Sequence, residues 1–261
     1  MWGKIIGSFA GFAMGGPFGA LFGAAAGHAY DRIHEETPET QLPPRPDGTA
    51  SLGYTYDGRG SEAARQTAFT IAVIVLGAKV AKVDGPVNRA EIDAFKEVFR
   101  VPPREARKVG HVYNSARQNA SDFEPYAQQM AILFRSEPAV LEDLLASLFY
   151  IARADGDIKP SEAAFLRRVG DLFGLDARAF ERVRSMFISS GAPAYPYGVL
   201  GLSRAASDAE LKNTYRRLIR EHHPDALSAK GVPKSFMAVA NQKMAAINAA
   251  DDQIQRERGL R

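Results

Sequence analysis

The chain has 261 residues, 46% of them apolar and 24% charged, so it can form one or two folded domains and is not broadly disordered. It has no cysteine, which excludes disulfides, thiol catalysis and cysteine-based metal sites. Its net charge of +3 is too small for chain-wide binding to nucleic acid. The excess positive charge lies in residues 195–261, where eleven Lys and Arg face seven Asp and Glu, and this predicts an acidic partner for that region.

The first thirty residues predict a transmembrane anchor helix. Between Lys4 and Asp31 lie 26 residues without a formally charged side chain, more than the roughly 20 that a helix needs to cross a bilayer. A cleavable signal peptide and an interfacial segment are the alternatives, and the flanking basic residues predict no orientation. Glycine recurs every fourth residue, which lets two membrane helices approach closely and predicts dimerisation through Gly7, Gly11, Gly15, Gly19, Gly23 and Gly27.

A repeated motif lies in the middle of the chain. Residues 31–60 contain many prolines and glycines without apolar periodicity and predict a flexible linker. Residues 61–190 have apolar residues at helical spacing, and two segments there match at an offset of 71 residues. The repeat predicts a bundle of two helix–loop–helix halves. The matched pairs are Asp84 with Asp155, Gly85 with Gly156, Val87 with Ile158, and Glu91 with Glu162.

The acidic residues of these loops are candidate ligands for a divalent cation, namely Asp84, Glu91, Asp155, Asp157 and Glu162. An EF-hand is excluded, because Val80 and Lys82, or Ile151 and Arg153, would occupy positions that need carboxylates. A structural alternative is helix capping by acids in a first turn. The region resembles the TerB family of helical bundles, some of which are implicated in metal binding, and both roles stay open.

The last part of the chain predicts a helical hairpin. Ser207 and Glu210 form a capping box, so a helix is expected to begin at Asp208 and to end at His223 before Pro224. A second helix is expected over residues 234–248. One side of the first helix carries the core stripe Leu211, Tyr215, Leu218, Ile219 and His222. Another side is cationic, with Lys212, Arg216, Arg217 and Arg220.

Residues 195–261 resemble a J-domain. The resemblance is carried by the Tyr-x-Val-Leu-Gly-Leu opening at residue 197, the basic helix, and the turn formed by His223, Pro224 and Asp225. J-domains bind DnaK-type chaperone ATPases, and the resemblance implies that this turn triggers ATP hydrolysis while Lys212, Arg216, Arg217 and Arg220 form the docking face. The chain departs from the usual pattern at Ala226, where Lys is common, and at Ala250-Asp251, where an Ala-Tyr pair is usual.

The order of anchor, TerB-like bundle and C-terminal J-domain resembles the DjlA family of membrane-anchored bacterial co-chaperones. The resemblance implies an all-α protein that stimulates a DnaK-type chaperone. It also implies a single pass through the inner membrane, with the N-terminus outside and the later domains in the cytoplasm. The alternative is a metal-responsive stress or signalling protein with an accessory J-like tail. No nucleophile–base pair, phosphate loop or metal triad is visible, so we expect a binding protein without a cofactor of its own rather than an enzyme.

Overall fold

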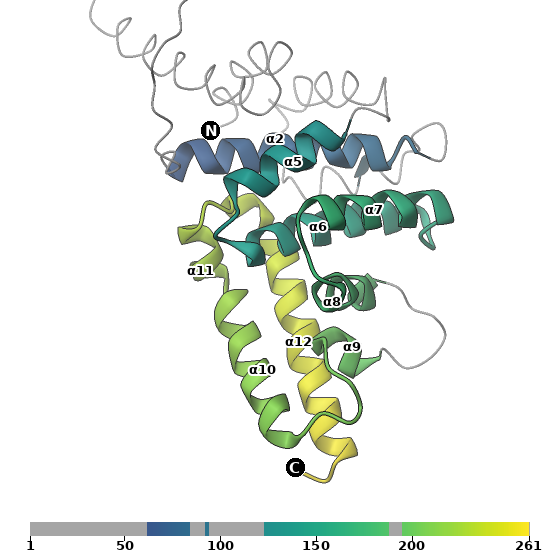
Figure 1. The fold of residues 1–261 in the computed structure, drawn as a ribbon, viewed down its shortest axis with the longest axis vertical. Helices are drawn as coiled ribbons and strands as arrows, with labels where there is room; N and C mark the ends of the chain where they lie inside the picture. The colour runs from purple at the N-terminus through teal and green to yellow at the C-terminus, as the bar shows by residue number, and fades with distance from the viewer. Residues whose placement is uncertain (1–61, 84–91, 94–122, 188–194, 261) are drawn as a thin grey trace, which may run out of the picture.

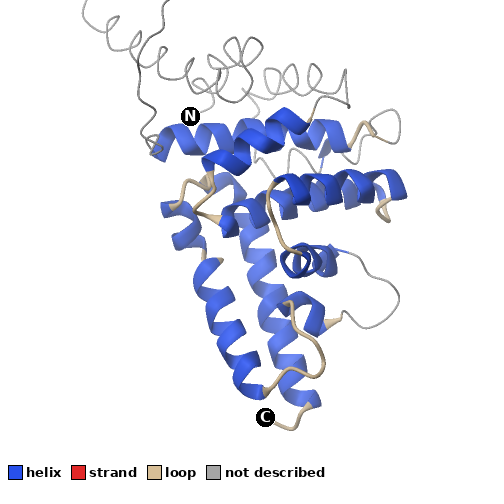
Figure 2. Cartoon of the chain, in the orientation of Figure 1, coloured by secondary structure: helices blue, strands red, loops and turns tan. Residues whose placement is uncertain are grey.

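The computed structural model describes residues 62–83, 92–93, 123–187 and 195–260. This part of the chain consists of helices, turns and loops without a β-strand (Figure 2), in agreement with the predicted all-α fold. No helix within it is both long and apolar enough to span a bilayer. The predicted anchor and linker, together with Asp84 and Glu91, lie outside the described residues.

The middle of the chain folds into a helical bundle built around helix α6 (Figure 1). Almost every side chain of α6 is buried, as expected for a helix whose apolar residues surround the whole axis. Helices α2, α7 and α8 contact α6, and α5 contacts α2 and α7. The bounds of these helices are α2 (Glu62–Val80), α5 (Glu124–Leu133), α6 (Pro138–Ala152), α7 (Pro160–Leu172) and α8 (Ala177–Phe187).

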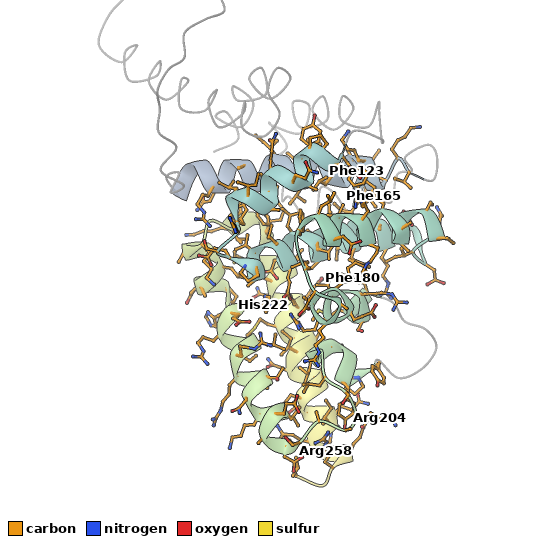
Figure 3. The ribbon with its side chains drawn as sticks, in the orientation of Figure 1. Phe123, Phe165, Phe180, Arg204, His222 and Arg258 are labelled. Atoms are coloured by element: carbon orange, nitrogen blue, oxygen red, sulfur yellow. The ribbon has the colours of Figure 1, made fainter. Side chains whose placement is uncertain are left out.

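Aromatic contacts join the helices of the bundle. The rings of Phe123 and Phe165, labelled in Figure 3, lie 4.3 Å apart between their centroids and connect the start of α5 with α7. Phe180 of α8 contacts Phe149 of α6 at 5.9 Å, edge to face. Gly170 lets the Phe180 ring lie close against α7, because a Cβ atom there would lie 2.8 Å from that ring.

The C-terminal region forms the expected hairpin of two antiparallel helices, α10 (Asp208–Glu221) and α12 (Met237–Glu257), as Figure 1 shows. The predicted start at Asp208 is confirmed, with the Ser207 hydroxyl accepting a hydrogen bond from the Glu210 N–H at 3.2 Å. The second helix ends beyond the predicted residue 248, because nothing between it and Gly259 breaks a helix. Helix α9 (Pro196–Leu200) packs against α12, while α11 (Pro224–Ala229) and η2 (Lys234–Phe236) connect the long helices.

One end of the hairpin shares its apolar core with the bundle. Five of its side chains belong to the same buried cluster as the bundle residues: Leu227, Val232, Phe236, Val239 and Ala240. The Phe236 ring lies 4.9 Å from that of Phe69 on α2, and α12 contacts α6. The opposite end has a separate core around Leu200, Leu218 and Ile254. The hairpin is therefore seated on the bundle by the end that carries the His-Pro-Asp turn.

Candidate chaperone-docking site

The His-Pro-Asp turn lies between α10 and α11 and faces outward. His223 is extended, with φ −61° and ψ 133°, as the residue before a proline prefers, and Pro224 opens α11. The His223 side chain caps α11, since its Nδ1 accepts a hydrogen bond from the Asp225 N–H at 3.2 Å. The side chains of His223 and Asp225 are 52% and 95% exposed, so both the imidazole and the carboxylate are open to contact by another protein.

The predicted docking residues lie on α10, and all four are exposed. The Nη1 atom of Arg217 lies 2.8 Å from Glu221 Oε2, so part of its charge is neutralised within the helix. Within the described part of the chain, Lys212, Arg216 and Arg220 form no ion pair. The surface before the turn therefore offers three unpaired cations to an acidic partner.

Arg258 fixes the end of the hairpin opposite the turn. Its guanidinium donates hydrogen bonds to Asp208 Oδ1 at 2.7 Å, to the Tyr197 hydroxyl at 3.1 Å and to the Arg204 carbonyl at 3.3 Å. In Figure 3, Arg204 and Arg258 lie at this end and His222 lies at the other. The start of α10 is thus tied to the end of α12 at this end of the hairpin.

Next to the turn is a buried group of charged side chains, here called the interdomain cluster: Glu142 and Asp143 of α6, Arg182 of α8, His222 after α10, and Lys243 of α12. Lys243 Nζ lies 2.8 Å from Asp143 Oδ1 and 3.3 Å from Glu142 Oε2. The Arg182 Nη2 atom donates to Glu142 Oε1 at 2.6 Å. The cluster thus joins the bundle to the hairpin by ion pairs that are shielded from water.

His222 occupies the centre of this cluster. Its Nε2 lies 3.4 Å from Glu142 Oε2 and its Nδ1 lies 3.3 Å from Asp143 Oδ1, although neither contact has the geometry of a good hydrogen bond. The predicted place of His222 on the core stripe is confirmed, since the residue is fully buried. Its charged partners were not identified from the sequence, although two adjacent acids within the apolar segment 138–152 are a usable signal.

The surrounding cations keep both carboxyl groups of the cluster ionised. Burial alone would raise the pKa of Glu142, but Lys243, His222 and Arg182 outweigh it and hold that pKa well below its usual range. Burial likewise opposes ionisation of Asp143, and Lys243 and His222 reverse the effect, so its pKa is lowered too. Both carboxyl groups of the cluster are therefore ionised at neutral pH.

Of the candidate metal ligands, the structure describes the side chains of Asp157 and Glu162 only. Asp157 is exposed, whereas Glu162 is buried and its Oε2 accepts a hydrogen bond from the Lys159 N–H at 2.8 Å. This is the capping role for an acid in the first turn of a helix. No group of three or more His, Asp or Glu in the described ranges is arranged to hold a metal ion. A metal site formed by the two loops remains a prediction.

Comparison with known families divides the chain into three matched segments. Residues 1–61 match the model of the co-chaperone DjlA transmembrane domain, and residues 70–185 match that of tellurite resistance protein TerB. Residues 195–257 match the model of the DnaJ domain, which includes the exposed turn and the basic helix.

Relatives that match over nearly their full length are named as DjlA co-chaperones. The chain is 31% identical to "Co-chaperone protein DjlA" of Photobacterium profundum, with both chains covered completely. Proteins of that name from Vibrio cholerae and Coxiella burnetii are 29% and 28% identical, and the alignments cover at least 98% of each chain. No solved structure matches this chain.

Proposed function

The chain belongs to the DjlA family of co-chaperones, and on that basis we propose that it is a membrane-anchored J-domain protein that binds a DnaK-type chaperone and stimulates its ATP hydrolysis. The observation that carries this function is the exposed turn of His223, Pro224 and Asp225 at the end of a basic helix. An outward-facing turn of this kind contacts a partner and is not an active site of its own. ATP hydrolysis therefore takes place on the chaperone.

Each part of the docking site has a separate role in this mechanism. The unpaired cations Lys212, Arg216 and Arg220 attract an acidic face of the chaperone and align α10 along it. The turn then meets the chaperone with a stiff backbone, because Pro224 fixes φ and the His223 ring caps α11. His223 and Asp225 supply the polar contacts that trigger hydrolysis.

Residues 1–30 are proposed to cross the inner membrane once, with the N-terminus outside and the remaining domains in the cytoplasm, where a DnaK-type chaperone and ATP are found. The match of residues 1–61 to a transmembrane domain supports the anchor. Anchoring confines the docking site to the membrane surface and raises its effective concentration there. The orientation is tested by protease treatment of cells from which the outer membrane has been removed, which would cleave the J-domain only if it faced outward.

The glycine stripe of the anchor is proposed to pair two copies of the chain in the membrane. Its period of four residues gives each helix a face without side chains, on which a second helix can pack closely. A pair of chains would present two docking sites at one place on the membrane.

The experiment that tests the function compares the full chain with its His223→Gln variant in detergent micelles, by the rate at which a DnaK-type chaperone hydrolyses ATP. We expect the native chain to raise the rate and the variant to lose about tenfold or more of that stimulation, because a central contact residue is removed. Circular dichroism should show equal helix content, since the His223 side chain is half-exposed. Undiminished stimulation by His223→Gln would refute the proposed function.

A further inference from the structure

We propose that Glu142 and Asp143 of the bundle are positioning residues for the His-Pro-Asp turn: through His222 they fix the direction in which the turn leaves α10. The inference rests on the function proposed above and adds to it. It gives the TerB-like bundle a part in stimulating the chaperone, because the two carboxylates belong to α6 and the turn belongs to the hairpin.

The first step of the link is covalent. His222 directly precedes His223, and its own N–H donates to the Leu218 carbonyl at 2.9 Å, which makes it the last residue tied to α10. Its ring points inward, where its nitrogens lie 3.3 Å and 3.4 Å from the carboxylates of Asp143 and Glu142. A rotation of the backbone at the turn would have to move this buried ring away from both acids.

The segment after the turn is held by the same bundle. Leu227 of α11 is fully buried in the shared core, three residues after Pro224. Lys230, at the end of α11, lies 3.2 Å from Glu137, the residue that precedes α6. Residues 223–225, of which His223 and Asp225 are exposed, are thus a short segment between two points attached to one end of α6.

Lys243 and Arg182 hold the carboxylates themselves in place. Lys243 contacts both acids from α12, and Arg182 contacts Glu142 from α8. Arg182 also lies against Gly201, where a Cβ atom would come within 2.9 Å of its Nη1 and where φ is +67°, so the Leu-Gly-Leu opening of the J-domain is shaped around it. These two side chains therefore hold Glu142 from two helices and Asp143 from one.

The ion pairs of the interdomain cluster determine how the hairpin is oriented on the bundle more than how tightly it is held there. Apolar contacts such as Phe236 with Phe69 already hold the hairpin on the bundle. Apolar surfaces tolerate sliding, whereas buried charges have few arrangements in which each of them is paired. The cluster therefore selects one seating of the hairpin and with it one orientation of the turn.

The test measures stimulation of a DnaK-type ATPase by the full chain in micelles, as a function of its concentration. Glu142→Gln and Asp143→Asn keep side-chain shape and remove one charge each. We expect maximal stimulation to fall about three- to tenfold, because fewer molecules have the competent turn, while the half-saturating concentration changes less than about twofold. Binding is spared because Lys212, Arg216 and Arg220 remain exposed.

The matched control is Val169→Ala, which removes buried volume from α7, a helix that contributes no residue to the cluster. It should lower the thermal midpoint as the charge variants do and keep maximal stimulation. The positioning role is overturned if both charge variants reach the maximal stimulation of the native chain. It is also overturned if Val169→Ala loses as much maximal stimulation as they do. If either charge variant fails to fold, the other decides.

Hydrogen exchange gives a readout that needs no chaperone. The amides of residues 225–229 should exchange faster in Asp143→Asn than in the native chain, with α7 unchanged, and equal exchange at the turn overturns the proposal. The two proposals fail separately. A native chain that stimulates through His223 with no effect of the carboxylates removes the positioning role alone, whereas a native chain that never stimulates removes both.

Discussion

At the scale of single residues, the cations of α10 differ in the charge they present. Arg216 is exposed without an acidic partner in the described chain, whereas Arg217 shares its charge with Glu221 at 2.8 Å. Lysines and arginines in the rim of an interface act mainly by attracting the partner from solution. The four residues of the predicted docking face are therefore expected to contribute unequally.

We predict that Arg216→Ala raises the half-saturating concentration for chaperone stimulation about three- to tenfold in low salt, and less at high ionic strength where charges are screened. Arg217→Ala should have a smaller effect. The control is Arg178→Ala, which removes an exposed cation from α8. Titrations of the chaperone at two salt concentrations measure the difference, and equal effects of all three substitutions would contradict the assignment of the docking face.

At the scale of secondary-structure elements, the interdomain cluster makes the seating of the hairpin on α6 sensitive to acid. The pKa values of Glu142 and Asp143 lie below their ordinary values of 4.5 and 3.8 in the folded chain. Groups with a lowered pKa stabilise the fold above their unfolded pKa, and this contribution disappears as the pH falls towards the folded value.

We therefore predict that the free energy of unfolding decreases as the pH is lowered below about 4.5, where the unfolded chain begins to bind protons that the folded cluster excludes. Each carboxyl group that is protonated only in the unfolded chain lowers this free energy by about 1.4 kcal/mol for every step of one in pH. Urea unfolding of the full chain at several pH values measures the decrease. Glu142→Gln should have a shallower pH dependence than the native chain. A variant whose stability follows the native pH curve would show that this carboxylate contributes nothing to it.

The elements that the sequence predicted best are those with local signals. The start of α10 follows from the cap at Ser207, and the turn follows from Pro224 and its neighbours. The end of α12 was predicted too early, because residues 249–257 have neither a strong apolar stripe nor a helix breaker. Lys243 shows what local sequence signals cannot predict, since it is a buried charged residue whose partner Glu142 lies 101 residues away. No local pattern encodes such a pairing.

At the scale of the whole molecule, the glycine stripe of the predicted anchor is proposed to pair two copies of the chain. We predict that Gly11→Ile with Gly15→Ile lowers the fraction of dimer in micelles, because bulky side chains separate the helix backbones. Ala13→Ile adds the same side chain off the glycine stripe and should leave the dimer unchanged. Sedimentation of the full chain measures both. Monomeric native protein would refute pairing through the anchor and leave the docking site unaffected.

The core that Leu227 and Phe236 share with the bundle has a consequence for protein engineering. The last quarter of the chain cannot be replaced as an independent module. A foreign J-domain grafted after residue 194 would leave a cavity beside Phe69, would remove Lys243 from Asp143, and would leave Glu142 with Arg182 alone, unless it also brought those apolar side chains and a lysine equivalent to Lys243. An exchange of the J-domain would have to include the bundle surface on which it packs.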